Sequence, residues 1–259
     1  MKSLFTIITL FITGLFAGML ILLEVGRRLG LRRREKMPAD SAEGLGAVEG
    51  ALFALLGLLI AFTFSGAAER FEARRHLIVE EANAIGTAYL RIDLLPAAAQ
   101  PAMRDGFRRY VDSRLAVYRA LPDLDAARAE LSRSAELQKE IWSTAVAACP
   151  GASSPSACVL LLPALNAMID ITTTRTVAAS THPPALVFAM LAVLALACSL
   201  LAGYGMAGSR VRSWIHVLAF AAVLTITVYV ILDYEFPRVG FIRIDPVDQV
   251  LVDVRAGME

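Results

Sequence analysis

Residues 46–66 read GAVEGALFALLGLLIAFTFSG, and this stretch decides the fold. It carries a single charged residue, Glu49, close to its start. A helix of roughly 20 apolar residues is needed to cross the hydrocarbon core of a bilayer, which is about 30 Å thick. The length and composition of this stretch therefore predict a membrane-spanning helix.

Three further stretches, at about 4–23, 184–206 and 214–232, are long and apolar enough to cross a bilayer. The first is too long for a cleaved signal peptide and is followed by a run of arginines, so we interpret it as a retained span. The link between the last two is short, which predicts an antiparallel hairpin over 184–233. Hydrophobic residues make up 57% of the chain and charged residues 19%, as expected of a multi-pass membrane protein rather than a soluble domain.

The second span has two patterned faces. Small residues at steps of three or four line one face and allow close helix packing in lipid: Gly50, Ala54, Gly57, Ala61 and Ser65. Beside them, Phe53, Ile60 and Phe64 form an apolar stripe. This stripe is expected either to contact lipid or another helix, or to form a hydrophobic constriction that gates a pore by dewetting.

Residues 67–183 are charge-balanced and helical in pattern, which predicts a soluble domain between the second and third spans. In its first helix an apolar residue recurs at every seventh position, which marks a buried seam: Phe71, Ile78, Ile85 and Ile92. Nothing breaks the helix before Pro96, so the second span is predicted to continue as one long helix. We therefore predict an all-α membrane protein with four spans and an inserted helical bundle; the tail at 234–259 has no assignable pattern.

The charges of the short loops predict an orientation. Basic residues prefer the cytoplasmic side of short loops. The loop after the first span holds six of them, and Arg210 and Arg212 lie in the link between the last two spans. Both termini and the 67–183 domain are therefore predicted on the non-cytoplasmic side.

The segment CPGASSPSAC, residues 149–158, is short and rich in turn-forming residues. One interpretation is a disulfide between Cys149 and Cys158, which would persist in an oxidising compartment and contribute roughly 2–3 kcal/mol of stability. The other is a pair of unrelated thiols at a helix–loop junction. A disulfide agrees with the orientation that the loop charges predict.

Signatures of catalysis are absent from the sequence. The three histidines lie far apart and form no metal-binding spacing with the cysteines, and there is no phosphate-binding loop or nucleophile elbow. We expect no enzymatic activity, no catalytic residue, no metal and no cofactor. A net charge of +1 also provides no basic field for nucleic acid.

Four acidic residues mark the ends of the spans: Glu24, Glu49, Asp233 and Glu235. Ionisable groups this close to lipid are costly unless they reach water or find a partner. They are expected to be solvated at the interface, to pair with arginines such as Arg70 or Arg238, or to line a permeation path.

Three segments together resemble the bacterial bestrophin-like domain family of membrane proteins. They are ALLGLLIAFTFSGAAERFEARR from residue 54, EEANAIGTAYLRIDLLP from residue 80 and LDYEFPRVGFIRI from residue 232. The resemblance covers about 48–244, and its most specific part is 81–96. This family is similar in layout to bestrophin anion channels, which are pentamers with a pore-lining second span.

The resemblance implies a homo-oligomeric channel-like protein in the bacterial inner membrane, passing small anions along the second span. A rival hypothesis is a membrane-anchored module that binds a partner or senses envelope conditions without transport. Within the matching motifs, the polar residues of interest are Glu81, Asn83, Gly86, Thr87 and Arg91. Bestrophins place the domain between their second and third spans in the cytosol, which conflicts with the loop charges: either this family is inverted, or the charge-based orientation is wrong, or the kinship is only architectural.

Overall fold

The computed structural model describes residues 2–36, 45–121, 123–152, 154–208 and 213–258. Within these ranges all regular structure is helical, and no strand occurs in them. Four helical stretches are long and apolar enough to cross a membrane. The predicted fold class, an all-α membrane protein with four spans, is confirmed.

The helices form two compact units, which we describe separately. The membrane unit comprises Lys2–Glu69 and His182–Phe236. The helical unit comprises Arg70–Thr181 and Pro237–Glu259.

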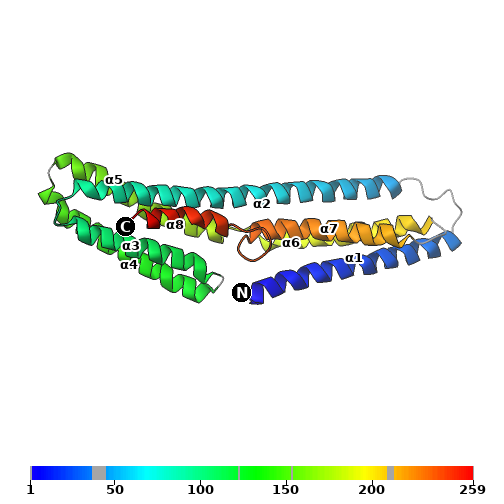
Figure 1. Ribbon diagram of the computed structural model, residues 1–259. Helices are drawn as coiled ribbons and strands as arrows, with labels where there is room; N and C mark the ends of the chain where they lie inside the picture. The colour runs from blue at the N-terminus through cyan, green and yellow to red at the C-terminus, as the bar shows by residue number, and fades with distance from the viewer. Residues whose placement is uncertain (1, 37–44, 122, 153, 209–212, 259) are drawn as a thin grey trace. The chain divides into compact units, whose positions relative to one another are not determined.

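The membrane unit contains α1 (Lys2–Lys36), the first part of α2 (Leu45–Leu90), α6 (Ala185–Gly205) and α7 (Trp214–Glu235). These helices carry their labels in Figure 1. A short 3-10 turn, η4 (Met206–Gly208), follows α6. Both α6 and α7 pack along α1. The core of this unit is a cluster of buried apolar side chains, which includes Leu15, Met19, Leu23, Leu56, Leu191, Ala195, Val217, Ala221 and Val228.

Helices α1 and α6 approach each other backbone to backbone at two glycines. A Cβ atom added at Gly26 would lie 1.9 Å from the carbonyl oxygen of Leu200, and one added at Gly203 would lie 2.0 Å from that of Leu23. No side chain fits at either position, so glycine is what permits this close crossing.

Helix α2 runs unbroken from Leu45 to Leu90, which confirms the predicted long helix. It tightens into the 3-10 turn η2 (Arg91–Leu94), and Leu95 is extended with φ −80° and ψ 160°. Pro96 disfavours a helical conformation for the residue before it, which accounts for the end of the helix at this point.

The helical unit contains the last part of α2 together with α3 (Gln100–Ala120), α4 (Leu124–Ala148), α5 (Pro155–Ser180) and α8 (Gln249–Ala256). Asp123 caps α4 by accepting hydrogen bonds from the backbone N–H groups of Asp125 and Ala126, both at 3.1 Å. Fully buried apolar side chains form its core: Ile78, Ile85, Ile92, Phe107, Val111, Ile141, Leu161 and Leu165.

The C-terminal segment, unassigned from sequence, forms the 3-10 turn η5 (Asp245–Asp248) and then α8. Tyr89 and Arg108 both donate hydrogen bonds to the carbonyl oxygen of Met258, at 3.1 and 2.7 Å. The segment is therefore bound to α2 and α3 within the helical unit.

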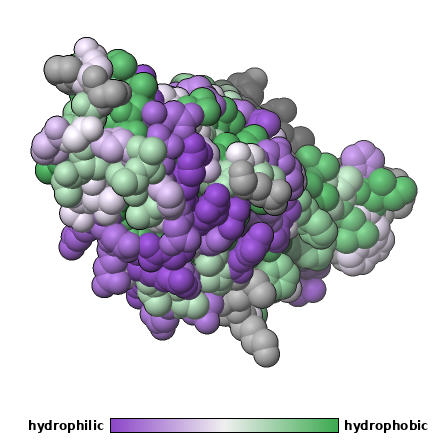
Figure 2. Space-filling view, turned by 60° about the vertical axis from the view of Figure 1, so that its left-hand side comes forward, coloured by the Kyte–Doolittle hydropathy of each residue, from purple (hydrophilic) through white to green (hydrophobic). Residues whose placement is uncertain are grey.

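Figure 2 turns the helical unit toward the viewer, and a broad band of hydrophilic residues crosses the face that it shows.

Candidate functional site

None of the residues that the structure describes covers the small-residue face of α2. All of its members are exposed: Gly50, Ala54, Gly57, Ala61 and Ser65. A Cβ atom added at Gly50 or Gly57 would meet no atom of the described residues within 4 Å. The other helices of the membrane unit thus pack on a different side of α2 and leave this face free.

The apolar stripe beside that face is only partly free. Phe53 packs edge-on against Phe220 of α7, with ring centroids 6.2 Å apart, and Ile60 lies half-buried against the core of the unit. Phe64 is 40% exposed and contacts the ring of Tyr234 at 5.5 Å. Of the three residues suggested as a constriction, Phe64 is the most accessible.

The membrane-edge acids occupy different environments. Glu24 accepts a hydrogen bond from Arg28 at 2.7 Å, and Glu49 is half-buried. Asp233 and Glu235 are buried, at 5% and 0% exposure, and an oxygen of Glu235 lies 2.8 Å from Nδ1 of His182. These four acids therefore do not form one site.

The five polar residues singled out between positions 81 and 91 also do not gather. Asn83 and Thr87 are exposed, and a side chain added at Gly86 would meet no described atom within 4 Å. Arg91 donates a hydrogen bond to the carbonyl oxygen of Leu160 in α5 rather than to Glu81. Glu81 alone points into the helical unit.

Glu81 is the centre of a buried ion-pair network. One of its oxygens accepts a hydrogen bond from Nε of Arg114 at 2.6 Å, and the other accepts from Arg175 and from the hydroxyl of Tyr118. The side chains of Glu81, Arg114 and Arg175 are 0%, 1% and 7% exposed. The network thus joins α2, α3 and α5 by charge inside the helical unit.

The ring of Tyr118 extends this network to the C-terminal segment. Guanidinium groups lie 4.2, 5.0 and 5.3 Å from its centroid, and they belong to Arg175, Arg238 and Arg114. Such cation–π contacts are stabilising when they are desolvated. Arg238, which the sequence suggested as a partner for the membrane-edge acids, bonds to Asp245 and Asp248 at 2.7 and 2.8 Å.

Burial and charge determine the protonation of the groups in α3. Removal of water, together with the nearby Glu81 carboxylate, raises the pKa of Tyr118, so its hydroxyl keeps its proton. Burial alone would lower the pKa of Arg114, but the carboxylate of Glu81 bonded to it acts in the opposite direction, and the net shift of that pKa is upward. The arginine therefore stays charged, as an ion pair with Glu81 requires.

Sequence reasoning missed Arg114 and Arg175 as partners of Glu81. The sequence does carry a signal for both arginines, because each lies at a position that the seven-residue spacing of its helix marks as buried. Arg114 lies seven residues after Phe107, and Arg175 lies seven after Met168; Phe107 and Met168 are both fully buried. A charged residue at a seam position needs a buried partner of opposite charge.

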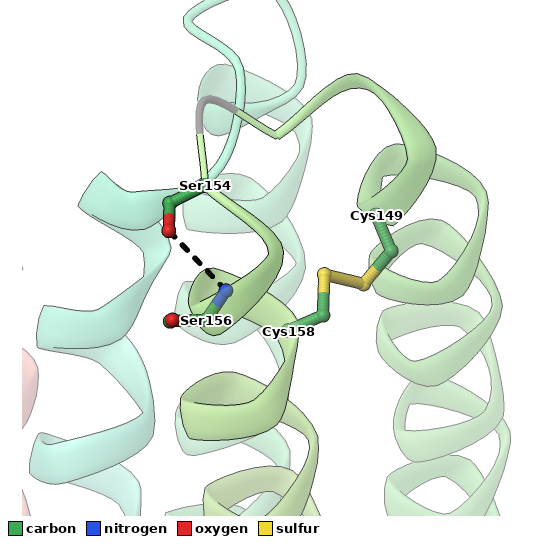
Figure 3. Close-up of a disulfide and its surroundings, with 4 residues drawn as sticks. All are labelled: Cys149, Ser154, Ser156 and Cys158. Carbon is green, nitrogen blue, oxygen red and sulfur yellow. Dashed lines mark hydrogen bonds between the residues drawn. A yellow bond between two sulfur atoms is a disulfide. The ribbon is translucent and has the colours of Figure 1, made fainter.

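The structure joins Cys149 and Cys158 in a disulfide, with their Cα atoms 5.8 Å apart (Figure 3). Cys149 follows the last residue of α4 and Cys158 lies in the first turn of α5. Ser154 caps α5 by accepting a hydrogen bond from the backbone N–H of Ser156 at 3.3 Å. The disulfide therefore links α4 and α5 covalently at the end where the two helices are joined.

The described residues hold no group of three or more His, Cys, Asp or Glu side chains placed to bind a metal ion. The features that remain are an uncovered α2 face in the membrane unit and a buried charge network in the helical unit. They define a four-span helical membrane protein whose longest helix carries both features.

The chain belongs to the bestrophin-like domain family, which matches residues 13–249. Its fold is similar to crystal structures of two single-residue variants of a bacterial bestrophin homologue from Klebsiella pneumoniae, with TM-scores of 0.64 and 0.58. Sequence identity is 14% and 13%, over 92% of this chain and 98% of the other chain in each case. No curated protein matches the sequence. At these identities the structural likeness establishes a shared fold.

Proposed function

We propose that this chain assembles into a homo-oligomeric membrane channel for small anions, with α2 lining the path. The observation that carries the proposal is the uncovered face of α2, where Gly50 and Gly57 have open space within an otherwise apolar span. Membership of the bestrophin-like family supports the channel class.

The packing of one copy supports an assembly of several copies. Met19, Leu191 and Ala221 are fully buried where α1, α6 and α7 meet, so the centre of the membrane unit is filled with mainly apolar side chains. This packing favours a water-filled path between copies rather than within one. Small residues favour close approach of helices in lipid, as an assembly around α2 requires.

Phe64 is proposed as the residue that narrows the path. It is 40% exposed and lies next to the small-residue face, whereas Phe53 and Ile60 are half-buried against their own chain. An apolar ring of such side chains restricts conduction by excluding water.

Reconstitution into liposomes tests the function. Chloride efflux and potassium efflux are measured with the purified protein, with empty liposomes as the background. We expect chloride efflux to exceed potassium efflux, and Phe64→Ala to increase chloride efflux because it widens the constriction.

Phe62→Ala is the matched control, because Phe62 is 68% exposed and lies two residues before Phe64. A separation of two residues places its side chain on the far side of the helix. Flux that is unchanged in Phe64→Ala, with assembly intact, would remove Phe64 from the path. If folded, inserted protein passes neither ion, the membrane-anchored interaction or sensing module becomes the better hypothesis.

We also propose that the protein lies in the bacterial inner membrane with its helical unit on the non-cytoplasmic side. The basic loops between spans and the disulfide at 149–158 support this orientation.

A further inference from the structure

The Cys149–Cys158 disulfide joins two helix ends of opposite polarity. Cys149 directly follows the last residue of α4, and Cys158 lies in the first turn of α5 (Figure 3). Aligned peptide dipoles give a helix a partial negative charge at its C-terminus and a partial positive charge at its N-terminus. Once the S–S bond opens, the start of α5 therefore stabilises a thiolate on Cys158, whereas the end of α4 destabilises one on Cys149.

Arg91 brings a further positive charge to the Cys158 side of the bond. It lies in η2, at the end of α2, and donates a hydrogen bond to the carbonyl oxygen of Leu160, two residues after Cys158. Asp93, the acid of the same turn, bonds to Arg104. A guanidinium near a cysteine stabilises its thiolate, as a helix N-terminus does. The channel proposal gives Arg91 no role.

The residues along the two helices add no charge that would cancel this asymmetry. Positions 150–157, between the cysteines, are Pro, Gly, Ala and Ser only. The nearest ionisable side chains before Cys149 in the sequence are Lys139 and Glu140, which carry opposite charges, and the first one after Cys158 is Asp170. Both cysteines are partly exposed, so a small thiol in solution can approach the bond.

We infer that this disulfide is an exchange site for a small thiol, which attacks the sulfur of Cys149 and expels Cys158 as the thiolate. A new S–S bond joins the small thiol to Cys149, and the electron pair of the old bond leaves with Cys158. The sulfur that leaves more readily is the one whose thiolate is better stabilised.

A second thiolate of the same kind completes the exchange. It attacks the small-molecule sulfur of the mixed disulfide and expels Cys149 as a thiolate, which takes up a proton. Two small thiols are thereby oxidised to their disulfide, and the disulfide of the protein is reduced. None of these steps involves ion conduction, so the inference holds or fails separately from the channel proposal.

Competition between the two thiols within one chain tests the inference, because the thiol that leaves in one direction attacks in the other. The purified full chain is reduced, freed of reductant under nitrogen and treated with less than one equivalent of iodoacetamide; mass spectrometry then locates the label. We expect Cys158 to be labelled over Cys149 by about threefold, since the helix ends favour its thiolate and reactivity follows part of that difference.

The same competition in concentrated urea is the first control. Unfolding removes the helix ends, so the two cysteines should be labelled equally. Equal labelling in the folded chain would overturn the inference, as would a loss of helical content on reduction, measured by circular dichroism. A disulfide that reduced glutathione opens in urea but leaves closed in the folded chain would also overturn it.

Arg91→Gln tests the contribution of the guanidinium and should lower the excess of label on Cys158. Arg128→Gln is the matched control, because Arg128 is an exposed arginine near the start of α4, about 30 Å along the helix from Cys149. It should leave the excess unchanged. Equal excesses in the two variants would overturn the role of Arg91.

Discussion

Glu81 shows how much one buried charge depends on its neighbours. Its carboxylate is fully buried and accepts hydrogen bonds from Arg114 and Arg175, whose guanidinium groups are also buried. Removing one partner of a buried ion pair costs about 3–5 kcal/mol, because the remaining charge is left without compensation. Glu81 therefore holds two cations that would otherwise repel each other inside the helical unit.

We predict that Glu81→Gln lowers the free energy of unfolding by about 3 kcal/mol, because two buried guanidinium groups lose their counter-charge. Glu72→Gln is the control, since Glu72 is 63% exposed and pairs with the nearby Arg75 on the surface. It should cost less than about 1 kcal/mol. Thermal unfolding in detergent, followed by circular dichroism, measures both, and equal midpoints for the two variants would contradict the prediction.

The α4–α5 hairpin is an element whose closed end is held covalently. The disulfide between Cys149 and Cys158 joins the end of one helix to the start of the next. A closed loop of this size restricts the unfolded chain and contributes roughly 2–3 kcal/mol in the chain-entropy model.

We predict that Cys149→Ser with Cys158→Ser destabilises the protein by roughly 2–3 kcal/mol. A reducing agent should lower the unfolding temperature of the wild-type protein and leave that of the double variant unchanged. Cys198→Ala serves as the control, because Cys198 is a free, buried cysteine in α6 and its variant should still respond to reduction. A wild-type midpoint that does not change on reduction would count against the prediction.

For the whole molecule, two observations make opposite predictions about the side of the membrane that holds the helical unit. The loop charges and the disulfide support the non-cytoplasmic side, whereas the resemblance to bestrophins implies the cytosol. A cysteine placed on each side of the membrane decides between the two.

We predict that Asn83→Cys, in a chain whose three native cysteines are replaced, reacts with a membrane-impermeant maleimide added to intact spheroplasts. Asn83 is exposed in the helical unit, and Arg32→Cys, exposed at the end of α1, is the partner control. Arg32→Cys should react only after the membrane is opened. The reverse pattern would place the helical unit in the cytoplasm.

The sequence by itself determined the spans and the long α2, because both follow from local properties. The length of an apolar run is set by bilayer thickness, and the helix continues until Pro96 stops it. The sequence also supplied Glu81 as a residue of interest, but it grouped Glu81 with Asn83 and Thr87, which are close along the chain and lie on other faces of the helix.

Only the tertiary structure decided the partners of that carboxylate. Arg114 belongs to α3 and lies 33 positions from Glu81 along the chain, and Arg175 belongs to α5 and lies 94 positions from it. It likewise showed that Phe53 and Ile60 pack on their own chain while Phe64 stays accessible. The physical reason is that periodicity tells which face of a helix is buried, whereas the identity of the neighbour depends on how separate helices pack together.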